Sequence, residues 1–436
     1  MKKILFSLFG ILLSTLPIHA QWDLNRCLDF AKANNKALLA QKQQLRVADY
    51  EQKIAAAKFL PEVNLAIESS YYWKIPVQSY PGELFGLPAE RVAIATGSKL
   101  SGNYDVHINW NAVDMQSWQN SKLEKLKSQS VAYGIQSMEQ LLLRNVTAAF
   151  YNIQIERQNK DLSDKLLAKH LLIHQLLSKK FQEGLLDKIA INQSTAIRRQ
   201  YEKYQAEQEM AYQKAVLDLK YWMGFPLEEP LELVAVSVNI AVLRILDFKA
   251  EQLPDYQEKE ASIKVAQQRL QASKYYRMPQ LSLGSSFGQI GFGEQLSTFT
   301  NFSKWHSNGY VGFRLRIPLF APGGAPTVKR NRALYEQTTQ EFVAYQDQEK
   351  KRYLQLQLDL KQTATTLNAQ EDLRKLAEEN LTLCNQKIEA GIMDMIQLQQ
   401  IQQELIKTVT AENKVRLDYL KNQIELNYLQ NETQKI

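Results

Sequence analysis

Four short segments of the chain alternate apolar and polar residues, the pattern of a strand with two different faces. In residues 62–74 the apolar side chains occupy odd positions, and in residues 103–112 they occupy even positions. Residues 280–290 and 309–320 alternate in the same way. The apolar positions are Val63, Leu65, Ile67, Tyr71, Trp73, Tyr104, Val106, Ile108, Trp110, Leu281, Leu283, Phe287, Val311, Phe313, Leu315, Ile317 and Leu319. At about ten residues each, these segments suit strands with one face on lipid and the other on water.

Long stretches without proline follow each pair of strands, from residue 114 to 222 and from 328 to 430. Shorter helical stretches, 24–59 and 255–276, precede the strand pairs and stop before Pro61 and Pro279. Two sets of residues in the long stretches recur at spacings of three and four, which predicts coiled-coil seams. These sets are Leu142, Val146, Ala149 and Ile153, and Leu373, Leu376, Asn380 and Leu383. The helix predicted from 114 to 183 would be about 105 Å long, longer than a globular domain needs.

A glycine and an aspartate three positions later interrupt each long helix. Gly184 is followed by Asp187, and Gly391 by Asp394. Glycine suits the left-handed residue that ends a helix, and aspartate can cap the next helix by accepting its free N–H groups. We therefore predict tight turns between antiparallel helices at about 183–188 and 390–395.

The two turns are part of a duplication of the chain. The segment around Gly184 aligns with that around Gly391 at an offset of 207 residues, and Pro61 aligns with Pro279 at an offset of 218. The difference places a longer loop between the strands of the first copy. We predict a first repeat at 21–223, a linker at 224–253 and a second repeat at 254–436. Each repeat reads as helix, strand, strand, long helix, turn and helix, a mainly α fold with a membrane β part.

Residues 1–20 have the pattern of a secretory signal peptide. Lys2 and Lys3 precede an apolar stretch, and Ala20 offers a cleavage site. We therefore expect an exported protein. No later apolar run is long enough for a helical span. With 45% hydrophobic residues, a net charge of +7 and no block of Lys or Arg, the composition argues against a disordered chain and against a nucleic-acid partner.

Four strands cannot close a barrel, and an open sheet edge is not tolerated in lipid. A membrane role therefore requires several copies of the chain. Three copies would give twelve strands and room for a pore, but the residues alone do not choose between three and four copies. Hairpins packed on helices in a soluble protein are the alternative interpretation of the same strands.

His170 and His174 stand four apart and would share one face of a helix, as metal ligands can. No cysteine or carboxylate follows at ligand spacing, which favours partly solvated helix histidines. Cys27 and Cys384 are too few for a disulfide framework, and we expect both to be thiols. A set of glycines fits neither nucleotide-binding fingerprint and is expected in a strand and its loop: Gly284, Gly288, Gly291 and Gly293. The sequence thus indicates no enzyme, cofactor or metal.

In its duplicated order and paired turns, the chain resembles the TolC-like outer membrane efflux protein family. The resemblance rests on the stretches from Gly184 to Asp187 and from Gly391 to Asp394, and it covers nearly the whole chain after residue 20. It implies that three protomers contribute four strands each to a twelve-stranded outer membrane β-barrel. A long α-helical barrel would continue this pore across the periplasm, and residues 224–253 would wrap it as an equatorial segment.

The resemblance also implies a function, the exit duct of a tripartite efflux pump or type I secretion system. Export would be passive, through a water-filled tunnel gated at the helix tips. The partners would be a periplasmic membrane-fusion adaptor and an inner-membrane pump of RND or ABC type. A secreted coiled-coil structural or adaptor protein without a channel is the main alternative, and a periplasmic binding protein or enzyme is a third.

Several residues receive roles from this resemblance. The residues expected to gate the channel and dock the adaptor are Gly184, Leu185, Asp187, Gly391, Ile392 and Asp394. Gln397 and Gln400 would line the tunnel constriction, where relatives commonly carry aspartates. The aromatic residues expected at the membrane interfaces are Tyr71, Trp73, Tyr104, Trp110 and Phe320.

Overall fold

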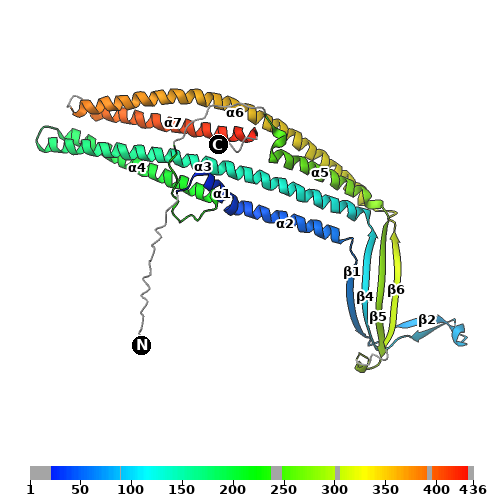
Figure 1. Cartoon of the computed structure of the whole chain (residues 1–436). Helices are drawn as coiled ribbons and strands as arrows, with labels where there is room; N and C mark the ends of the chain where they lie inside the picture. Colours follow the sequence, from blue (N-terminus) through cyan, green and yellow to red (C-terminus); the bar gives the residue numbers. More distant parts are fainter. Residues whose placement is uncertain (1–20, 89, 237–247, 300–304, 390–394, 431–436) are drawn as a thin grey trace, which may run out of the picture. The chain divides into compact units, whose positions relative to one another are not determined.

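The computed structural model describes residues 21–88, 90–236, 248–299, 305–389 and 395–430 (Figure 1). The predicted signal peptide lies outside these ranges. The contacts divide the chain into two units. The helical unit comprises Met1–Gln43, Tyr133–Gln257 and Ala344–Ile436, and the strand unit comprises Gln44–Ala132 and Glu258–Val343. Each unit therefore contains segments from both halves of the sequence.

The long strands and long helices follow the same order in the two halves of the chain. The first half contains α1 (Leu24–Asn34), α2 (Lys36–Ala57), β1 (Glu62–Tyr71), β2 (Val77–Pro81), η1 (Gly82–Phe85), β3 (Arg91–Ala95), β4 (Leu100–Val113), α3 (Met115–Gln182) and α4 (Lys188–Met223). The second contains η2 (Ala250–Gln252), α5 (Pro254–Lys274), η3 (Tyr275–Arg277), β5 (Gln280–Gly293), η4 (Leu296–Phe299), β6 (Trp305–Arg316), α6 (Gly324–Glu389) and α7 (Met395–Leu429). Both halves thus give helix, two long strands, a very long helix and a returning helix.

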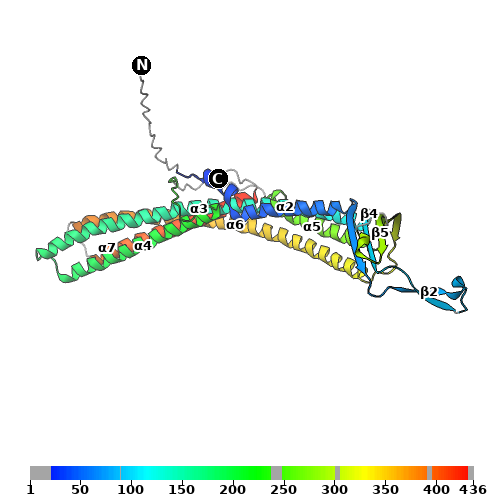
Figure 2. The same ribbon diagram turned by 90° about the horizontal axis from the view of Figure 1, so that it is seen from below.

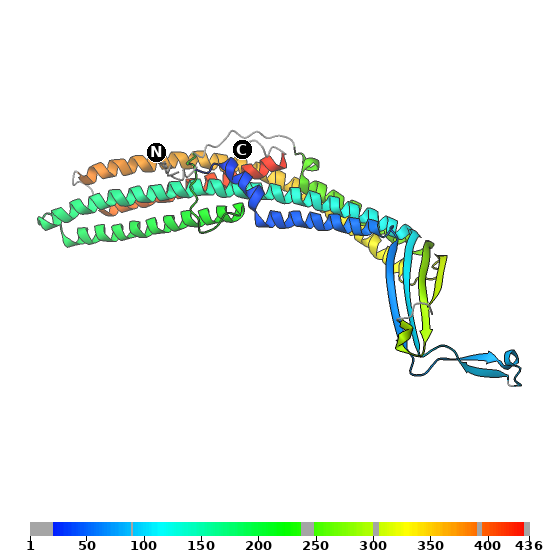
Figure 3. The same ribbon diagram turned by 60° about the horizontal axis from the view of Figure 1, so that its bottom comes forward.

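The strand unit holds a four-stranded antiparallel sheet in the order β1-β4-β5-β6, which Figure 3 shows most openly. Its register places apolar positions of neighbouring strands opposite one another. Val63 lies opposite Ile108, and Leu283 lies opposite Phe313. Cross-strand neighbours share a face of a sheet, so the apolar positions of the four strands form one continuous surface. β6 ends at Arg316, which leaves Phe320 beyond the strand.

β2 and β3 pair with each other in a separate two-stranded sheet. They lie between β1 and β4, where the unequal offsets of the two repeats place a longer loop. The corresponding connection between β5 and β6 contains η4 and the residues from 300 to 304, which lie outside the described ranges. The extra length of the first repeat therefore folds as a hairpin with η1 at its end.

In the helical unit, α4 runs back along α3, and α7 runs back along α6 (Figure 2). All four helices contribute to one apolar cluster, which includes Leu167, Ile197, Leu381 and Leu398. Two helices that pack on each other through residues spaced three and four apart bury one stripe of each surface. This cluster therefore holds the two helical hairpins together.

The two predicted seams have different outcomes. Leu142, Val146 and Ile153 on α3 are buried, which confirms the first seam. The second set is not buried within the protomer, because Leu373 and Leu376 are half exposed, and a seam there stays a prediction. α6 instead buries a neighbouring stripe that carries Ala377, Leu381 and Cys384. The apolar residues of the predicted second seam remain on the surface of the protomer: Leu373, Leu376 and Leu383.

Asn35 separates α1 from α2 and joins them to the end of α4. Its Oδ1 accepts the backbone N–H of Leu38 at 2.9 Å and so caps α2, while its Nδ2 donates to the carbonyl of Trp222 at 2.8 Å. The left-handed residue that caps the C-terminus of α4 follows two residues later and is Gly224, whose φ is 71°. A buried asparagine thus connects the start of one helix to the last turn of another.

Among the described residues, no helix combines the length and the apolar character that a membrane span requires.

Candidate functional site

The turn between α3 and α4 has the conformation that its residues predict. Gly184 has a φ of 72°, its N–H donates to the carbonyl of Phe181, and the N–H of Leu185 donates to the carbonyl of Lys180. This pair of bonds is the Schellman ending of a helix. Asp187 then caps α4 by accepting the N–H of Ala190 at 2.8 Å. The predicted left-handed glycine and capping aspartate are therefore confirmed at this tip.

The α3–α4 tip is exposed. The side chain of Leu185 is 72% exposed and that of Ile189 is 66% exposed. A Cβ added at Gly184 would meet no atom of the described residues within 4 Å. An apolar side chain held at the end of a capped helical turn is available to another molecule. Its role in gating or docking stays a prediction.

The second tip falls largely outside the described residues. Gly391, Ile392 and Asp394 belong to the undescribed segment 390–394. Gln397 and Gln400, in the first turns of α7, are exposed on either side of the fully buried Leu398. Both glutamines are thus on the polar side of α7, and their place in a constriction stays a prediction.

The apolar face of the four-stranded sheet is exposed in the protomer. The side chains of Leu65 and Ile67 on β1, and of Val311 and Phe313 on β6, are each more than 60% exposed. An apolar surface of this extent marks a contact with lipid or with another protein. β1 and β6 are also the two edges of the sheet, and in the described part of the chain their outer sides pair with no strand.

The opposite face of the sheet is polar and closely packed around one carboxylate. Asp105 on β4 is buried and accepts hydrogen bonds from Asn103 at 2.7 Å and from Ser286 at 3.4 Å. Gly288 lies opposite Asp105, and a Cβ there would lie 2.2 Å from its Oδ1 and 2.1 Å from the carbonyl of Tyr104. The close approach explains why this position of β5 is glycine. The other glycines expected in a strand and its loop, Gly284, Gly291 and Gly293, also lie within β5.

The predicted interface aromatics lie at both ends of the strands. Tyr71 is the last residue of β1, and Trp73, which follows it, is 91% exposed. The ring of Tyr104 lies 5.6 Å from that of Trp305. At the helix end, the indole of Trp110 donates to the carbonyl of Phe59 at 2.8 Å, and Phe320 is 84% exposed. A membrane-interface role for these rings stays a prediction.

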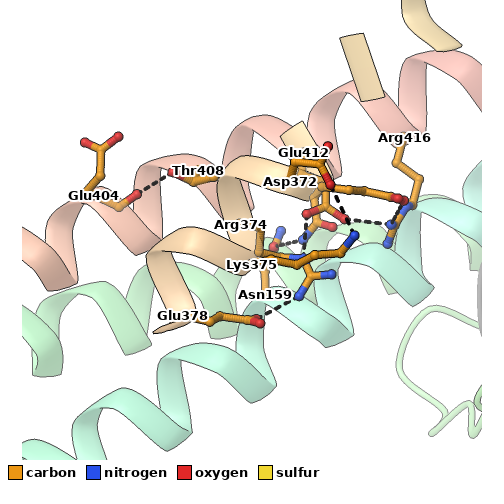
Figure 4. Close-up of polar contacts among 11 residues, drawn as sticks. Asn159, Asp372, Arg374, Lys375, Glu378, Glu404, Thr408, Glu412 and Arg416 are labelled. Carbon is orange, nitrogen blue, oxygen red and sulfur yellow. Dashed lines mark hydrogen bonds and ion pairs between the residues drawn. The ribbon is translucent and has the colours of Figure 1, made fainter. Parts of the chain in front are cut away.

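An ion-pair network fastens α6 to α7 (Figure 4). Glu412 on α7 is 2% exposed and accepts Arg374 Nε of α6 at 2.7 Å and Arg416 of α7 at 2.6 Å. Next to it, Asn413 donates to Asn159 of α3 at 2.5 Å. The spacings Arg374 to Glu378 and Glu412 to Arg416 are the helical four-residue pairs that a reading of the sequence for charge patterns could have found. The ion pair between Arg374 of α6 and Glu412 of α7 joins residues far apart in the sequence, and no local sequence pattern predicts it.

His170 is fully buried, which corrects the expectation of a partly solvated histidine, while His174 is half buried. Both rings contact Ser194 of α4 rather than a common ligand position. Within the described residues, no group of three His, Cys, Asp or Glu side chains is placed to hold a metal ion. Cys27 and Cys384 are buried thiols, and burial raises the pKa of Cys27 to about 12. Neither thiol is therefore set up as a nucleophile.

The described start of the predicted linker packs within the helical unit. The carbonyl of Glu232 accepts the N–H of Trp22 at 2.9 Å, and the N–H of Val234 donates to the carbonyl of Trp22 at 3.0 Å. Gln154 of α3 donates to the carbonyl of Val234 at 3.0 Å. Residues 237–247, in the middle of this segment, lie outside the described ranges.

Known proteins of the same architecture were found by sequence and by structure. No family model matches the chain. A curated relative, the pyoverdine export outer membrane protein OpmQ of Pseudomonas putida, is 20% identical over 270 residues, which cover 61% of this chain and 56% of that protein. The chain thus aligns with only about half the length of this relative.

Two solved structures match almost the full length. A crystal structure of CusC, described for its transmembrane channel formation, has a TM-score of 0.74 and 15% identity, over 94% of this chain and 92% of that chain. The CmeC outer membrane channel of Campylobacter jejuni has a TM-score of 0.75 and 14% identity, over 94% and 86%. The chain has the TolC-like fold.

The elements of this chain correspond to those of the TolC-like fold. The four strands, the long helices and the paired hairpins all belong to it, since the match covers 94% of the chain. Within this TolC-like frame, Gly184 and Asp187 form a helical tip, and Asn35, Asp105 and Glu412 are polar anchors that the sequence did not reveal.

Proposed function

We propose that this protein is an outer membrane channel that serves as the exit duct of a tripartite export system. Export is passive diffusion through a water-filled tunnel, and the protein has no catalytic activity of its own. The fold shared with CusC, described for transmembrane channel formation, and with the CmeC outer membrane channel supports this proposal. The main observation behind the proposal is the four-stranded sheet, which has one apolar face and one polar face.

The sheet needs partners because its two edges, β1 and β6, pair with no further strand in the described part of the chain. A strand edge or an open sheet is costly in hydrocarbon, where no water satisfies the backbone. In the proposed assembly, three copies join β1 of one protomer to β6 of the next, which gives a twelve-stranded barrel. The apolar face, with Leu65 and Phe313, faces lipid, and the polar face, with Asp105, faces the lumen.

The helical unit also has surface that a second copy would cover. Leu373, Leu376 and Leu383 form an exposed apolar stripe on α6 with spacings of three and seven. Such a stripe on a long helix is typical of packing against another helix. In the trimer, these helices line a tunnel that extends from the outer membrane into the periplasm.

The exposed tip at Gly184, Leu185 and Asp187 is the proposed contact with a periplasmic adaptor. The second tip, with Gly391, Ile392 and Asp394, would take the equivalent position, and Gln397 and Gln400 would surround the entrance. An inner-membrane pump of RND or ABC type would supply the energy. The relative from Pseudomonas putida is named for pyoverdine export, and a small-molecule cargo is accordingly the first class to screen.

A pair of adjacent residues on β1 tests the membrane role directly. Leu65 belongs to the apolar face and Asn64 to the polar face, and both are exposed in the protomer. A lysine facing lipid near the middle of the bilayer costs about 2–4 kcal/mol, whereas a lumen substitution does not carry this cost. Leu65→Lys should therefore abolish heat-modifiable trimers in the outer membrane fraction, and Asn64→Lys should preserve them.

Equal assembly of the two variants, or a soluble periplasmic monomer in the unmodified strain, would contradict the channel. The alternative, a secreted coiled-coil adaptor without a channel, predicts these results. Export itself is then measured as accumulation of a fluorescent drug in cells that lack the gene and carry each variant. Only variants that form trimers are informative in that assay.

A further inference from the structure

A fully buried histidine joins α3 to α4 on the way to the exposed tip. His170 has no exposed surface, and its Nε2 lies 3.0 Å from the carbonyl oxygen of Ser194 on α4. A carbonyl oxygen can only accept, so Nε2 carries the proton and donates. The neutral ring therefore keeps an unprotonated Nδ1.

The second ring nitrogen of His170, Nδ1, has no acceptor for a proton in the described part of the chain. Nδ1 of His170 is buried without a hydrogen-bond partner. The ring of Tyr201 on α4 lies 5.5 Å from the imidazole, and Tyr201 belongs to the apolar cluster that the four long helices share. Protonating Nδ1 would bury an N–H donor without an acceptor and a positive charge without a neutralising carboxylate among the described residues, which is costly.

The charged groups near His170 increase this cost. His174, one turn along α3, has its Nδ1 2.9 Å from the hydroxyl of Ser194, and Arg198 lies one turn along α4. Arg198 is a cation, and His174 becomes one when it is protonated, so both repel a positive charge on His170. Arg198 also pairs with Glu202 at 3.6 Å. α6 and α7 contribute Ala377, Leu381, Leu398, Leu405 and the thiol of Cys384 to the same cluster, and burial raises the pKa of that thiol.

We propose that His170 makes the packing of α4 on α3 sensitive to acid, so that protonation at Nδ1 loosens the hairpin that ends at Gly184. His170 lies 14 residues from Gly184 on one continuous helix, about 21 Å along its axis. A change in packing at His170 therefore bears on the tip of the same hairpin. The inference concerns the stability of this hairpin and holds whether or not the protein is a channel.

The direction of the pH effect follows from the environment of the two rings. Burial is the main cause that lowers the pKa of His170 and of His174 below the ordinary value of about 6.5, and nearby cations lower it further. The hydrogen bond to Ser194 opposes the shift of the pKa of His170 without reversing it. The opened hairpin therefore binds protons that the packed hairpin does not. The stabilisation is present above about pH 6.5 and is lost as the pH falls below it.

Hydrogen exchange of the full-length protein in detergent tests the proposal, with rates corrected for the intrinsic effect of pH. Between pH 7.5 and 5.5, a single histidine with an ordinary pKa when exposed can raise the opening constant up to about tenfold. We expect peptides from residues 160–205 to lose protection by several-fold. The α6–α7 hairpin contains no histidine, and its peptides are the internal control.

Variants separate the two histidines. His170→Leu should remove the acid response of residues 160–205, and His174→Gln should keep most of it. His170→Gln provides a second neutral replacement should the leucine variant not assemble at pH 7.5. An equal acid response in both hairpins of the unmodified protein, or an unchanged response in the His170 variants, would overturn the proposal.

Discussion

Arg374 on α6 donates from Nε to Oε2 of Glu412 on α7 at 2.7 Å, and this carboxylate is only 2% exposed. The other oxygen of Glu412 accepts Arg416 at 2.6 Å, and Arg416 also reaches Glu371 at 3.2 Å. One buried carboxylate thus connects two arginines from two helices. The arginines are 30% and 16% exposed, so each keeps part of its hydration.

Glu412→Ala should destabilise the helical unit by about 3 kcal/mol, the low end of the range for breaking a buried ion pair. The loss arises because two guanidinium groups then lie side by side without their shared carboxylate. Asp372→Ala is the matched control, because Asp372 pairs with Lys375 on the surface of α6 with both side chains well exposed. That change should stay within about 0.5 kcal/mol. Thermal unfolding in detergent measures both, and similar losses would show that Glu412 is not a special anchor.

Alanine substitutions at Gly184 and Gly224 distinguish the cost of backbone strain from the cost of a steric clash. Both have a φ close to 70°, but a Cβ at Gly184 meets no atom within 4 Å, whereas a Cβ at Gly224 would lie 2.4 Å from the carbonyl oxygen of Asn34. Gly184→Ala should cost only the left-handed conformation, about 1–2 kcal/mol. Gly224→Ala should cost a further 1–3 kcal/mol, roughly the penalty of overpacking. Equal stability of the two variants would mean that the end of α4 shifts away from Asn34 at no cost in stability.

The tip variant also tests the proposed docking. Gly184→Val should distort the turn more than Gly184→Asn, since asparagine tolerates the left-handed conformation and a β-branched residue does not. We expect the valine variant to lose export while trimers persist, and the asparagine variant to keep it. Full export by trimers of the valine variant would remove the tip from the mechanism.

Substitutions at Asn35 separate the contributions of its two side-chain hydrogen bonds. Asn35→Asp keeps an acceptor for the N–H of Leu38 but has no donor for the carbonyl of Trp222, and Asn35→Ala lacks both. The alanine variant should lose about 1 kcal/mol from the cap and about 1 kcal/mol from the second bond. Hydrogen exchange distinguishes them: the aspartate variant should expose the end of α4 while the start of α2 stays protected. Loss of protection in α2 in both variants would contradict this division.

Two glycines of the sheet make opposite predictions. At Gly288 a Cβ would collide with the backbone of Tyr104 and with Asp105, whereas at Gly312 it would meet nothing within 4 Å. Gly288→Ala should therefore prevent assembly of the sheet, and Gly312→Ala should be nearly neutral. The yield of heat-modifiable trimers from purified membranes compares the two. Normal assembly of Gly288→Ala would show that β4 and β5 can separate at this point.

Much of this architecture follows from local patterns. The helix ends at Gly184 and Asp187 and the alternation of Leu65 and Val106 depend on neighbouring residues, and they predict a turn and a two-faced strand correctly. The exposed second seam on α6 was not predictable in this way. Its leucines have helical spacing whether another helix of the same chain or a second copy covers them.

The anchors that the sequence did not reveal depend on distant contacts. Asn35 meets Trp222 from 187 positions away, and Asn159 meets Asn413 from 254 positions away. A single asparagine in a helical stretch has no periodic signal, because its partner is fixed by tertiary packing. His170 was predicted to be partly solvated for the same reason, since only the return of α4 places Ser194 and Tyr201 over its ring.

The hairpin of β2 and β3 forms a ladder of its own, and its stem is closed by bonds from Tyr72 to Lys99 and from Thr96 to Pro76. It shares no ladder with the four-stranded sheet in the described part of the chain. This stretch is therefore a natural attachment point for a reporter: an epitope tag could replace the segment around Gly86 while β1 and β4 keep their pairing. Labelling of that tag on intact cells would reveal which side of the envelope the loops face.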